Sequence, residues 1–296
     1  GVGGAKLIDL LNFNPDLYHL NEAHGASSIF YLYKKYGNKE EVRKRLVFTT
    51  HTPEEAGNEK HDIFLCEKMG YFCGLPMEEV RSLTGLTDDL FNHSLVALRF
   101  AKLANGVSQL HGEVSRKMWG KYEGICKITS ITNAQNWHYW ADKQLYHYML
   151  NDNEAAFDDR KNYLKKRAFE IVADQTGKIF KPEIFTIVWA RRFAGYKRAD
   201  LITRNEERFS ALLANKKYPV QIIWAGKPYP MDYPSITDFD KLVNLSKEHQ
   251  NMAVCIGYEL ALSKRLKQSS DLWLNNPRVP REASGTSGIT AAMNGA

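Results

Sequence analysis

Short runs of β-branched and aromatic residues alternate along this chain with longer segments whose apolar residues recur every three or four positions. A short apolar run predicts a buried strand, and the longer spacing predicts a helix with one apolar face. Because the two kinds of segment alternate, the pattern predicts parallel sheets covered by helices. The predicted strands span residues 16–20, 45–50, 106–111, 126–132, 185–191, 220–225, 252–257 and 272–275.

Two helices stand out in the same pattern. Residues 94–104 carry Val96, Phe100 and Leu103 at helical spacing, and the Asn-Gly pair that follows is typical of a helix end before the next strand. Residues 235–248 form a second apolar stripe between two predicted strands. The sequence therefore predicts a βαβ step in each half of the chain.

The stretch 158–175 is charged and predicts one or two solvated helices rather than a strand, so the domain junction is expected around it. A length of 296 residues is enough for about two domains. We expect a sheet-containing domain over residues 1–145, a helical connection over 146–180 and a second sheet-containing domain over 181–296.

Composition excludes several classes of protein. Forty basic and thirty-four acidic residues give a net charge of +6, and 44% hydrophobic with 25% charged residues is ordinary for a globular chain rather than a disordered or collagen-like one. No apolar run approaches the roughly 18 to 20 residues of a membrane span. The glycine-rich start lacks the basic flank and apolar block of a secretory signal, so the cytoplasm is the expected compartment.

The four cysteines, Cys66, Cys73, Cys126 and Cys255, have spacings that fit neither a zinc site nor a CxxC redox motif. We expect buried, reduced thiols and no metal site.

The clearest candidate for chemistry is the segment 191–198, where Arg191, Arg192 and Lys197 follow a buried-looking strand. Ligands of open α/β sheets bind at the carboxyl ends of strands, and guanidinium groups match phosphate oxygens at two points. The segment therefore predicts a phosphate or diphosphate partner. Two other basic clusters, residues 43–45 and 165–167, are expected to be solvated faces, and no nucleic-acid partner is expected.

A second candidate is the loop 282–288, with the sequence EASGTSG, which precedes a short predicted helix at 289–293. Small residues let backbone amides approach a ligand, and the positive end of the following helix favours an anion. Glu282 adds a carboxylate that could bind sugar hydroxyls beside a phosphate.

These segments carry a family resemblance. WARRFAGYKRADLI, QIIWAGKPYP, GYELALSKRLKQSSDLWLNNPR and PREASGTSG resemble C-terminal signatures of the α-glucan (glycogen, starch and maltodextrin) phosphorylases, and LNEAHGASS, VFTTHTPEEAGNEKHD, NGVSQLHGEVSRKMW and ITNAQNWHYW resemble N-terminal ones. The matches follow family order over essentially the whole chain. The resemblance implies a GT-B-like fold, in which two Rossmann-like parallel-sheet domains face each other across a cleft.

The resemblance also implies an activity, the retaining phosphorolysis of terminal α-1,4-linked glucose in a glucan or maltodextrin to glucose 1-phosphate. By position, Arg192 and Lys197 match the pair that holds the substrate phosphate, and both are candidate catalytic residues. Glu282 matches a carboxylate on the glucose hydroxyls, and His24 matches a histidine that lines the cleft and is a further catalytic candidate.

The family cofactor is pyridoxal 5′-phosphate, whose phosphate serves there as proton donor and acceptor. By the same matching, Arg191 corresponds to a lysine on the cofactor phosphate, and Gly285 and Thr286 to further donors. Thr290 stands where the family has the lysine that holds the cofactor covalently, and threonine cannot form that bond. The nearest upstream lysine is Lys267 and none follows, so we expect non-covalent binding at most.

Three functions remain open. The first is a phosphorylase-like glucosyltransferase acting on a glucan and inorganic or sugar phosphate. The second is an α-glucosyltransferase of the same fold that uses a nucleotide sugar and needs no pyridoxal phosphate. The third is a non-catalytic glucan-binding or regulatory module. Both outer portions of a complete enzyme are expected to lie outside this chain, and oligomerisation is left open.

Overall fold

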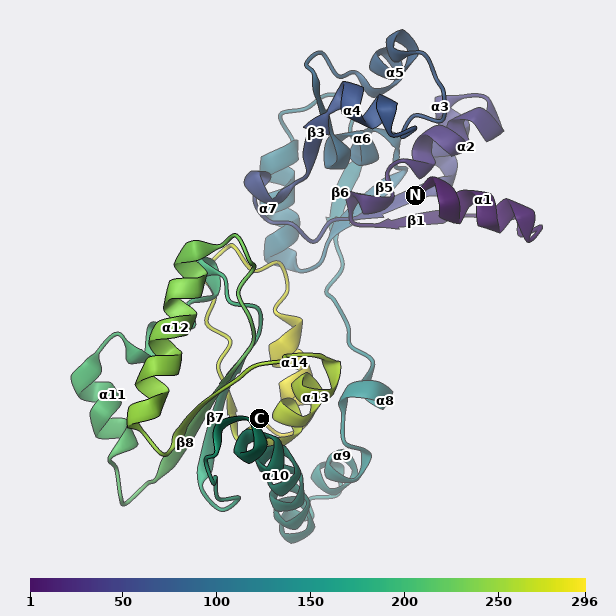
Figure 1. Cartoon of the computed structure of the whole chain (residues 1–296). Helices are drawn as coiled ribbons and strands as arrows, with labels where there is room; N and C mark the ends of the chain where they lie inside the picture. The colour runs from purple at the N-terminus through teal and green to yellow at the C-terminus, as the bar shows by residue number, and fades with distance from the viewer. The chain divides into compact units, whose positions relative to one another are not determined.

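A computed structural model describes all 296 residues and divides them into two compact units, Gly1–Asn133 and Ala134–Ala296. Each unit contains a parallel four-stranded sheet, which confirms the α/β class with two Rossmann-like units (Figure 1). The division lies earlier than the boundary expected at residue 145. The reason is that α9 (Lys143–Leu150) packs against α10 (Glu154–Thr176), and α10 in turn packs against the second sheet.

The first unit is built on the sheet order β1-β2-β5-β6, with every pairing parallel. Its core is one continuous cluster of apolar side chains between the sheet and the helices. A short antiparallel pair, β3 and β4, lies outside this sheet. The strands are β1 (Tyr18–Asn21), β2 (Leu46–Thr49), β3 (Lys60–Asp62), β4 (Leu90–Asn92), β5 (Leu103–Gly106) and β6 (Lys127–Ser130).

The helices of the first unit are α1 (Val2–Leu10), α2 (Ser28–Tyr36), α3 (Lys39–Arg45), α4 (Ile63–Lys68), α5 (Met77–Thr84), α6 (His93–Phe100) and α7 (Gln109–Trp119), with short 3₁₀ turns η1 (Ala23–Gly25) and η2 (Glu55–Gly57).

The predicted helix 94–104 and strand 106–111 are displaced from the real elements. Helix α6 stops at Phe100, because Ala101 is extended, and β5 already begins at Leu103. The Asn-Gly pair thus ends a strand rather than a helix. Ser108 then caps α7 by accepting a hydrogen bond from His111 N at 3.0 Å. At Gly106 a Cβ atom would lie 2.8 Å from Gly112 N, so glycine permits the close approach of α7 to the strand end.

A polar network lies beside the first core. His93 Nε2 lies 2.8 Å from His61 Nδ1, and the Tyr71 hydroxyl lies 2.8 Å from His93 Nδ1. Both ring nitrogens of His93 are therefore engaged, and its side chain is buried. Burial, together with the charge of His61, lowers the pKa of His93 to about 4.

Acidification is expected to destabilise the first unit through His93. The unfolded chain takes up this proton near pH 6.5, whereas the folded chain takes it up only near pH 4. The free energy of unfolding should therefore fall as pH drops through this interval, by about 2–3 kcal/mol for this one group. Urea unfolding near pH 7 and near pH 4.5 measures the effect, and His93→Gln should show a smaller difference between the two. An equal pH dependence in both proteins would contradict this assignment.

The second unit is built on the sheet order β10-β7-β8-β9, again entirely parallel. The strands are β7 (Phe185–Ala190), β8 (Val220–Ala225), β9 (Met252–Cys255) and β10 (Leu272–Trp273). Besides α9 and α10, the helices are α8 (Trp137–Trp140), α11 (Glu206–Leu213), α12 (Tyr233–Glu248), α13 (Leu260–Ser269) and α14 (Thr286–Ala292), with 3₁₀ turns η3 (Gly195–Lys197) and η4 (Leu201–Thr203).

Both faces of this second sheet are covered, which explains why its strands read as continuous apolar runs. Alternate residues of β7 enter different cores: Ile187 and Trp189 pack with α11 and α12, whereas Val188 and Ala190 pack with α10, α13 and α14. Figure 1 shows these two groups of helices on opposite sides of β7 and β8.

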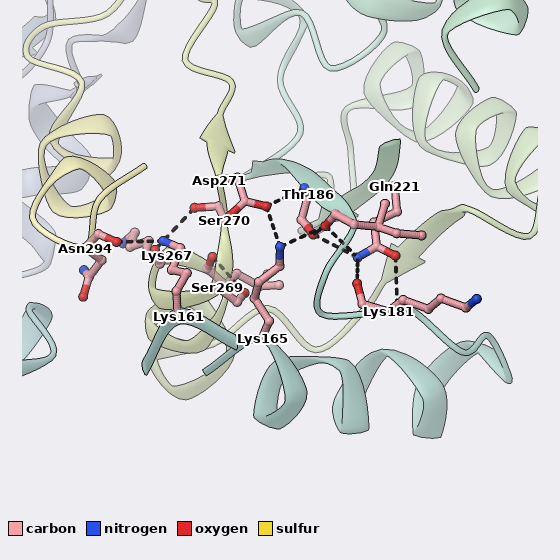
Figure 2. A network of polar contacts seen from close by, with 12 residues as sticks. Lys161, Lys165, Lys181, Thr186, Gln221, Lys267, Ser269, Ser270, Asp271 and Asn294 are labelled. Carbon is pink, nitrogen blue, oxygen red and sulfur yellow. Dashed lines mark hydrogen bonds and ion pairs between the residues drawn. The ribbon is translucent and has the colours of Figure 1, made fainter. Parts of the chain in front are cut away.

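Helix α10 differs from the solvated helices expected for residues 158–175. It is one helix of 23 residues, and its buried positions include Lys161 and Lys165 as well as Phe169 and Val172. Lys165 Nζ lies 2.6 Å from Asp271 Oδ2 and donates to Ile184 O at 2.9 Å, while Lys161 donates to Asn294 O at 2.7 Å (Figure 2). Both lysines are therefore buried and bonded within the unit. Residues 165–167 were expected to form a solvated face, and this expectation is wrong for Lys165.

The cysteines are all free, as expected. Cys66, Cys126 and Cys255 are buried and Cys73 is half-buried, and burial raises the pKa of each of these thiols. None of the helices combines the length and apolar character needed to cross a membrane. The cytoplasmic location stays a prediction.

Candidate functional site

The candidate site lies at the carboxyl edge of the second sheet. Strands β10, β7 and β8 are neighbours in this sheet, and the first residues after them are Leu274, Arg191 and Gly226, respectively. Carboxyl ends of parallel strands meet at one edge, so segments distant in sequence come together there. Arg191 N donates to Ala225 O at 3.0 Å, which holds the two loops side by side.

Arg191 is the central residue of this edge. Its side chain is only 5% exposed, and its Nη2 donates to Asn275 Oδ1 and, at 2.8 Å, to Ser287 Oγ. Its Nε and Nη1 are buried and have no hydrogen-bond acceptor. Glu282 is the nearest carboxylate, with Oε2 at 3.8 Å from Nη1. Burial lowers the pKa of the Arg191 guanidinium, yet its ordinary value is so high that the group stays charged.

Lys197 and Glu282 form an ion pair beside Arg191. Lys197 Nζ lies 3.1 Å from Oε1 and 2.9 Å from Oε2 of Glu282, and both side chains are largely buried. The structure therefore brings three of the predicted residues, Arg191, Lys197 and Glu282, into one cluster that joins the 191–198 segment to the 282–288 loop.

The 191–198 segment is fixed by a second set of bonds. Arg198 Nε donates to Asn276 O at 2.7 Å and Asn276 Nδ2 donates to Arg198 O at 3.0 Å. Trp189 Nε1 donates to Asn276 Oδ1 at 3.1 Å. This pairing holds Lys197 close to the chain that leads to Glu282.

Two glycines allow the close approach. Gly226 has φ +151, and a Cβ there would lie 2.0 Å from Arg191 O, so no side chain fits between the two strand ends. Gly285 has φ +68, and its Cβ would lie 2.8 Å from Asn275 Nδ2. Glycine at 285 thus keeps the loop against Asn275, one of the two residues that hold Arg191.

The other predicted residues of this unit lie around the cluster. Arg192 is exposed to solvent directly after Arg191, and Thr286 is half-buried at the first position of α14. The assignment of Arg192 to a substrate phosphate is not tested by these contacts and stays a prediction.

Pyridoxal phosphate, the cofactor that the resemblance implies, fits these residues in one respect. Its phosphate suits the free Nε and Nη1 of Arg191, which lack acceptors. Position 290 offers no amine: Thr290 is buried, and its hydroxyl donates to Thr286 O at 3.2 Å and Ser287 O at 3.0 Å within its own helix. When bound, the cofactor would supply a phosphate group able to exchange protons with a substrate phosphate.

His24 belongs to the first unit. It lies in η1, just after β1, with Nδ1 3.7 Å from Glu59 Oε2 and a mostly exposed side chain. It lines a small cavity of about 80 Å³ together with Glu22, Thr52, Asn58, Glu59 and Ser94. These polar groups sit at the carboxyl edge of the first sheet, which is the edge where a ligand is expected.

Sequence reasoning missed several residues of both edges. In the second unit, Asn275 and Ser287 accept hydrogen bonds from Arg191. The only sequence signal for them was that they lie in the Asn-Asn-Pro segment and the Ser/Gly-rich loop. In the first unit, Glu22 accepts hydrogen bonds from His51 N at 2.6 Å and from Thr52 Oγ1 at 3.0 Å. Glu22 has φ +63, a conformation that only the folded structure reveals.

The chain is similar to known proteins over its whole length. It is 30% identical to the maltodextrin phosphorylase of Thermococcus litoralis and 30% identical to the glycogen phosphorylase of Aquifex aeolicus, in both cases over 100% of this chain, and it covers 42% and 51% of those proteins. It is 44% identical to an uncharacterised protein of Methanocaldococcus jannaschii over 99% of this chain and 55% of that protein. No family model matches the chain.

The chain is an α/β protein with two Rossmann-like units, and a strand edge of the second unit carries basic residues and a carboxylate. The similarities to these phosphorylases support the α-glucan phosphorylase resemblance at the level of the family. It spans about half the length of the curated relatives that it matches.

Proposed function

We propose that this chain is an α-glucan phosphorylase-like glucosyltransferase, which transfers the terminal α-1,4-linked glucose of a glucan to phosphate with retention and releases glucose 1-phosphate. The observation that carries the proposal is the buried Arg191, whose Nε and Nη1 have no acceptor beside the Lys197–Glu282 pair. Buried donors are normally satisfied, and a phosphate oxygen would satisfy these.

The charges of the site support a doubly charged anion. Arg191, Arg192 and Lys197 are opposed by the single carboxylate of Glu282, which leaves two positive charges. A phosphate dianion compensates both. Its binding between Arg191 and Lys197 would also leave Glu282 oxygens free to accept hydrogen bonds from glucose hydroxyls, because a carboxylate has about four acceptor positions.

The remaining assignments follow the family. Arg192 and Lys197 hold the substrate phosphate, Glu282 binds the glucose, and His24 lines the glucan subsites of the first unit. With pyridoxal phosphate bound, Arg191, Gly285 and Thr286 would hold its phosphate; without the cofactor, the free donors of Arg191 are open to the substrate phosphate. In the transition state the positive charge developing on the glucose would be stabilised by the nearby phosphate dianion, and the proton needed by the leaving glucan oxygen would come from that phosphate.

A second candidate is favoured by Thr290. Since this residue offers no amine, a reaction that needs no pyridoxal phosphate deserves a separate test. Arg192 and Lys197 suit the diphosphate of a nucleotide-glucose donor as well as they suit a single phosphate. The chain would then transfer glucose from the nucleotide to a glucan.

The assay is glucose 1-phosphate release from maltodextrin and inorganic phosphate, with and without added pyridoxal phosphate. The proposal expects release that depends on the added cofactor. Transfer from nucleotide-glucose without cofactor would favour the second candidate, and glucan binding with neither activity would favour a binding module.

The variant Glu282→Gln tests whether Glu282 binds the glucose while the basic residues bind the phosphate. Affinity for glucose 1-phosphate should fall about 10- to 100-fold, because hydrogen bonds to a charged group contribute about 1.5–3 kcal/mol each. Affinity for inorganic phosphate should rise, since Lys197 loses its partner carboxylate. Isothermal titration calorimetry measures both. Parallel changes for the two ligands would count against a glucose-binding role of Glu282.

A further inference from the structure

A cavity of about 620 Å³ lies in the first unit and shares no lining residue with the smaller cavity beside His24. It is bounded by α1, by α2, which packs against α1, and by residues 70–74, the loop that follows α4 (Figure 1). Three lysines line it, namely Lys6, Lys34 and Lys35, and no aspartate or glutamate does. The cavity therefore has a basic wall that the proposed function does not use.

Two of these lysines are held in place by the fold. Lys35 Nζ donates to Asp9 Oδ1 at 2.5 Å, and the other oxygen of Asp9 accepts from the Tyr31 hydroxyl at 2.7 Å. Lys34 Nζ donates to Cys73 O at 3.0 Å, which joins α2 to the 70–74 loop. A long side chain that is already ordered loses less conformational entropy when a ligand binds. The two ammonium groups are thus prepared for an anion.

The charges around the cavity are not balanced. Asp9 compensates Lys35, whereas Lys6 and Lys34 have no carboxylate within ion-pair distance. Two positive charges are therefore left over, and a concave wall concentrates the field of such charges. A phosphate dianion would compensate both. Each ammonium also has N–H groups to donate, since Lys34 uses only one of its three in the bond to Cys73 O.

The 70–74 loop leaves the cavity open. Gly70 has φ +71 and Gly74 has φ +76, and a Cβ at either position would meet nothing within 4 Å. These glycines are therefore required by the backbone conformation and not by close packing. Cys73, between them, is half-buried. Burial raises the pKa of its thiol, while the charges of Lys6 and Lys34 act in the opposite direction, as expected for a thiol beside both lysines.

We propose that this cavity binds the phosphate group of a small phosphorylated metabolite, with Lys6 and Lys34 as the direct ligands and Lys35 as a fixed positive charge beside them. Ammonium groups are common phosphate ligands. The volume is within the range of about 300–1,000 Å³ that is usual for small-molecule sites, so the organic part of the metabolite has room as well. The site is independent of the proposed function, because it uses none of the residues assigned to glucosyl transfer.

Cys73 provides a local reporter for the test. The other three cysteines are buried, so a neutral alkylating reagent should label Cys73 first. The whole chain is treated with iodoacetamide, and the alkylation of each cysteine is followed by mass spectrometry. Saturating inorganic phosphate or glycerol 3-phosphate should slow the alkylation of Cys73 at least about fivefold, because a bound ligand shields the thiol. Sodium chloride at equal ionic strength and glycerol should have little effect.

Substitutions of the lysines test their roles as ligands. Lys6→Met and Lys34→Met should each raise the phosphate concentration that gives half-maximal protection by about tenfold, because each removes a charge-assisted hydrogen bond. Lys68→Met is the matched control, since Lys68 is an exposed lysine of α4 that does not line the cavity. Its midpoint should stay unchanged. Midpoints are compared instead of rates, because loss of the Lys34 contact alters the basal exposure of Cys73, and thermal unfolding verifies that each variant folds.

Four outcomes would overturn the proposal. The first is equal protection by sodium chloride, which would reduce the effect to screening. The second is an unchanged midpoint in the Lys6 and Lys34 variants, and the third is an equal shift in Lys68→Met. The fourth is a midpoint for glycerol 3-phosphate far above that for inorganic phosphate, which would exclude a phosphorylated metabolite.

The second unit is proposed to bind phosphate too, and Arg191→Met separates the two sites. This variant should lose phosphate affinity in the second unit and keep the protection of Cys73 unchanged. A shift of the Cys73 midpoint in Arg191→Met would overturn the separate site. Protection of Cys73 in a chain that releases no glucose 1-phosphate would support this inference and count against the proposed activity alone.

Discussion

Replacement of Arg191 by methionine is expected to weaken phosphate binding strongly and to change the stability of the protein little. The side chain is buried, and two of its N–H positions have no acceptor, so the folded protein carries a desolvated charge that is only partly compensated. An apolar side chain of similar length removes that cost but also leaves Asn275 Oδ1 and Ser287 Oγ without their donor, so we expect the free energy of unfolding to change by no more than about 1–2 kcal/mol. Urea unfolding measures this change.

The same substitution should weaken the binding of inorganic phosphate and glucose 1-phosphate by about 100-fold or more, because two charge-assisted hydrogen bonds of about 1.5–3 kcal/mol each are lost. Calorimetric titration measures this loss. A large loss of phosphate affinity with little change in stability is what a binding residue produces and a structural residue does not.

Arg198→Met is the matched control for Arg191. Arg198 lies in the same segment, but its Nε and Nη2 donate to Asn276 O and Pro277 O, so its bonds are satisfied within the fold. Its replacement should lower stability, with a smaller loss of phosphate affinity than Arg191→Met. If Arg191→Met instead destabilises the protein and leaves phosphate affinity intact, the phosphate-binding role of Arg191 is wrong.

Replacement of Asp271 by alanine is expected to destabilise the second unit strongly. The Oδ2 atom of Asp271 accepts from Lys165 Nζ at 2.6 Å and from Thr186 N at 2.7 Å, and the Lys165 side chain is 5% exposed. Without the carboxylate, Lys165 keeps only Ile184 O, and the free energy of unfolding should fall by about 3–5 kcal/mol.

Two controls accompany the Asp271 variant in urea unfolding. The double variant Lys165→Met with Asp271→Ala should recover a large part of the loss, because the unpaired buried charge is gone. Arg204→Ala, which breaks the more exposed pair with Asp200, should cost less than about 1 kcal/mol. A small loss for Asp271→Ala, comparable to that of Arg204→Ala, would show that Lys165 reaches water when its partner is absent.

The fold was largely predictable because the central strands of the second sheet, covered on both faces, are almost entirely apolar. β8, at Val220–Ala225, coincides with its predicted range, and β7 and β6 differ from theirs by one or two residues at the ends. The prediction of a helix at 94–104 and a strand at 106–111 was wrong for a local reason. A helix and a strand follow each other with two residues between them, and the Ser108 cap that begins α7 lies where the strand was predicted.

The candidate site was predictable in part. Arg191, Lys197 and Glu282 follow from their place after a strand and in a small-residue loop, and the structure joins them. The partners of Arg191, namely Asn275 and Ser287, lie far from it along the chain and carry no periodic signal. The roles given to Arg192, Gly285, Thr286 and His24 depend on the family resemblance and await ligand binding.

The sequence by itself determined the alternation of strands and helices, the resemblance to the α-glucan phosphorylases and the absence of a lysine at position 290, because these depend on residue type and spacing alone. Only the tertiary structure decided which basic side chains are buried and which of those lack an acceptor. Lys165 and Lys267 are both lysines of predominantly polar helical segments, yet Nζ of Lys165 pairs with Asp271 whereas Nζ of Lys267 lies over the ring of Trp140. That difference arises from segments packed across from each helix, since the environment of a buried charge is set by neighbours distant along the chain.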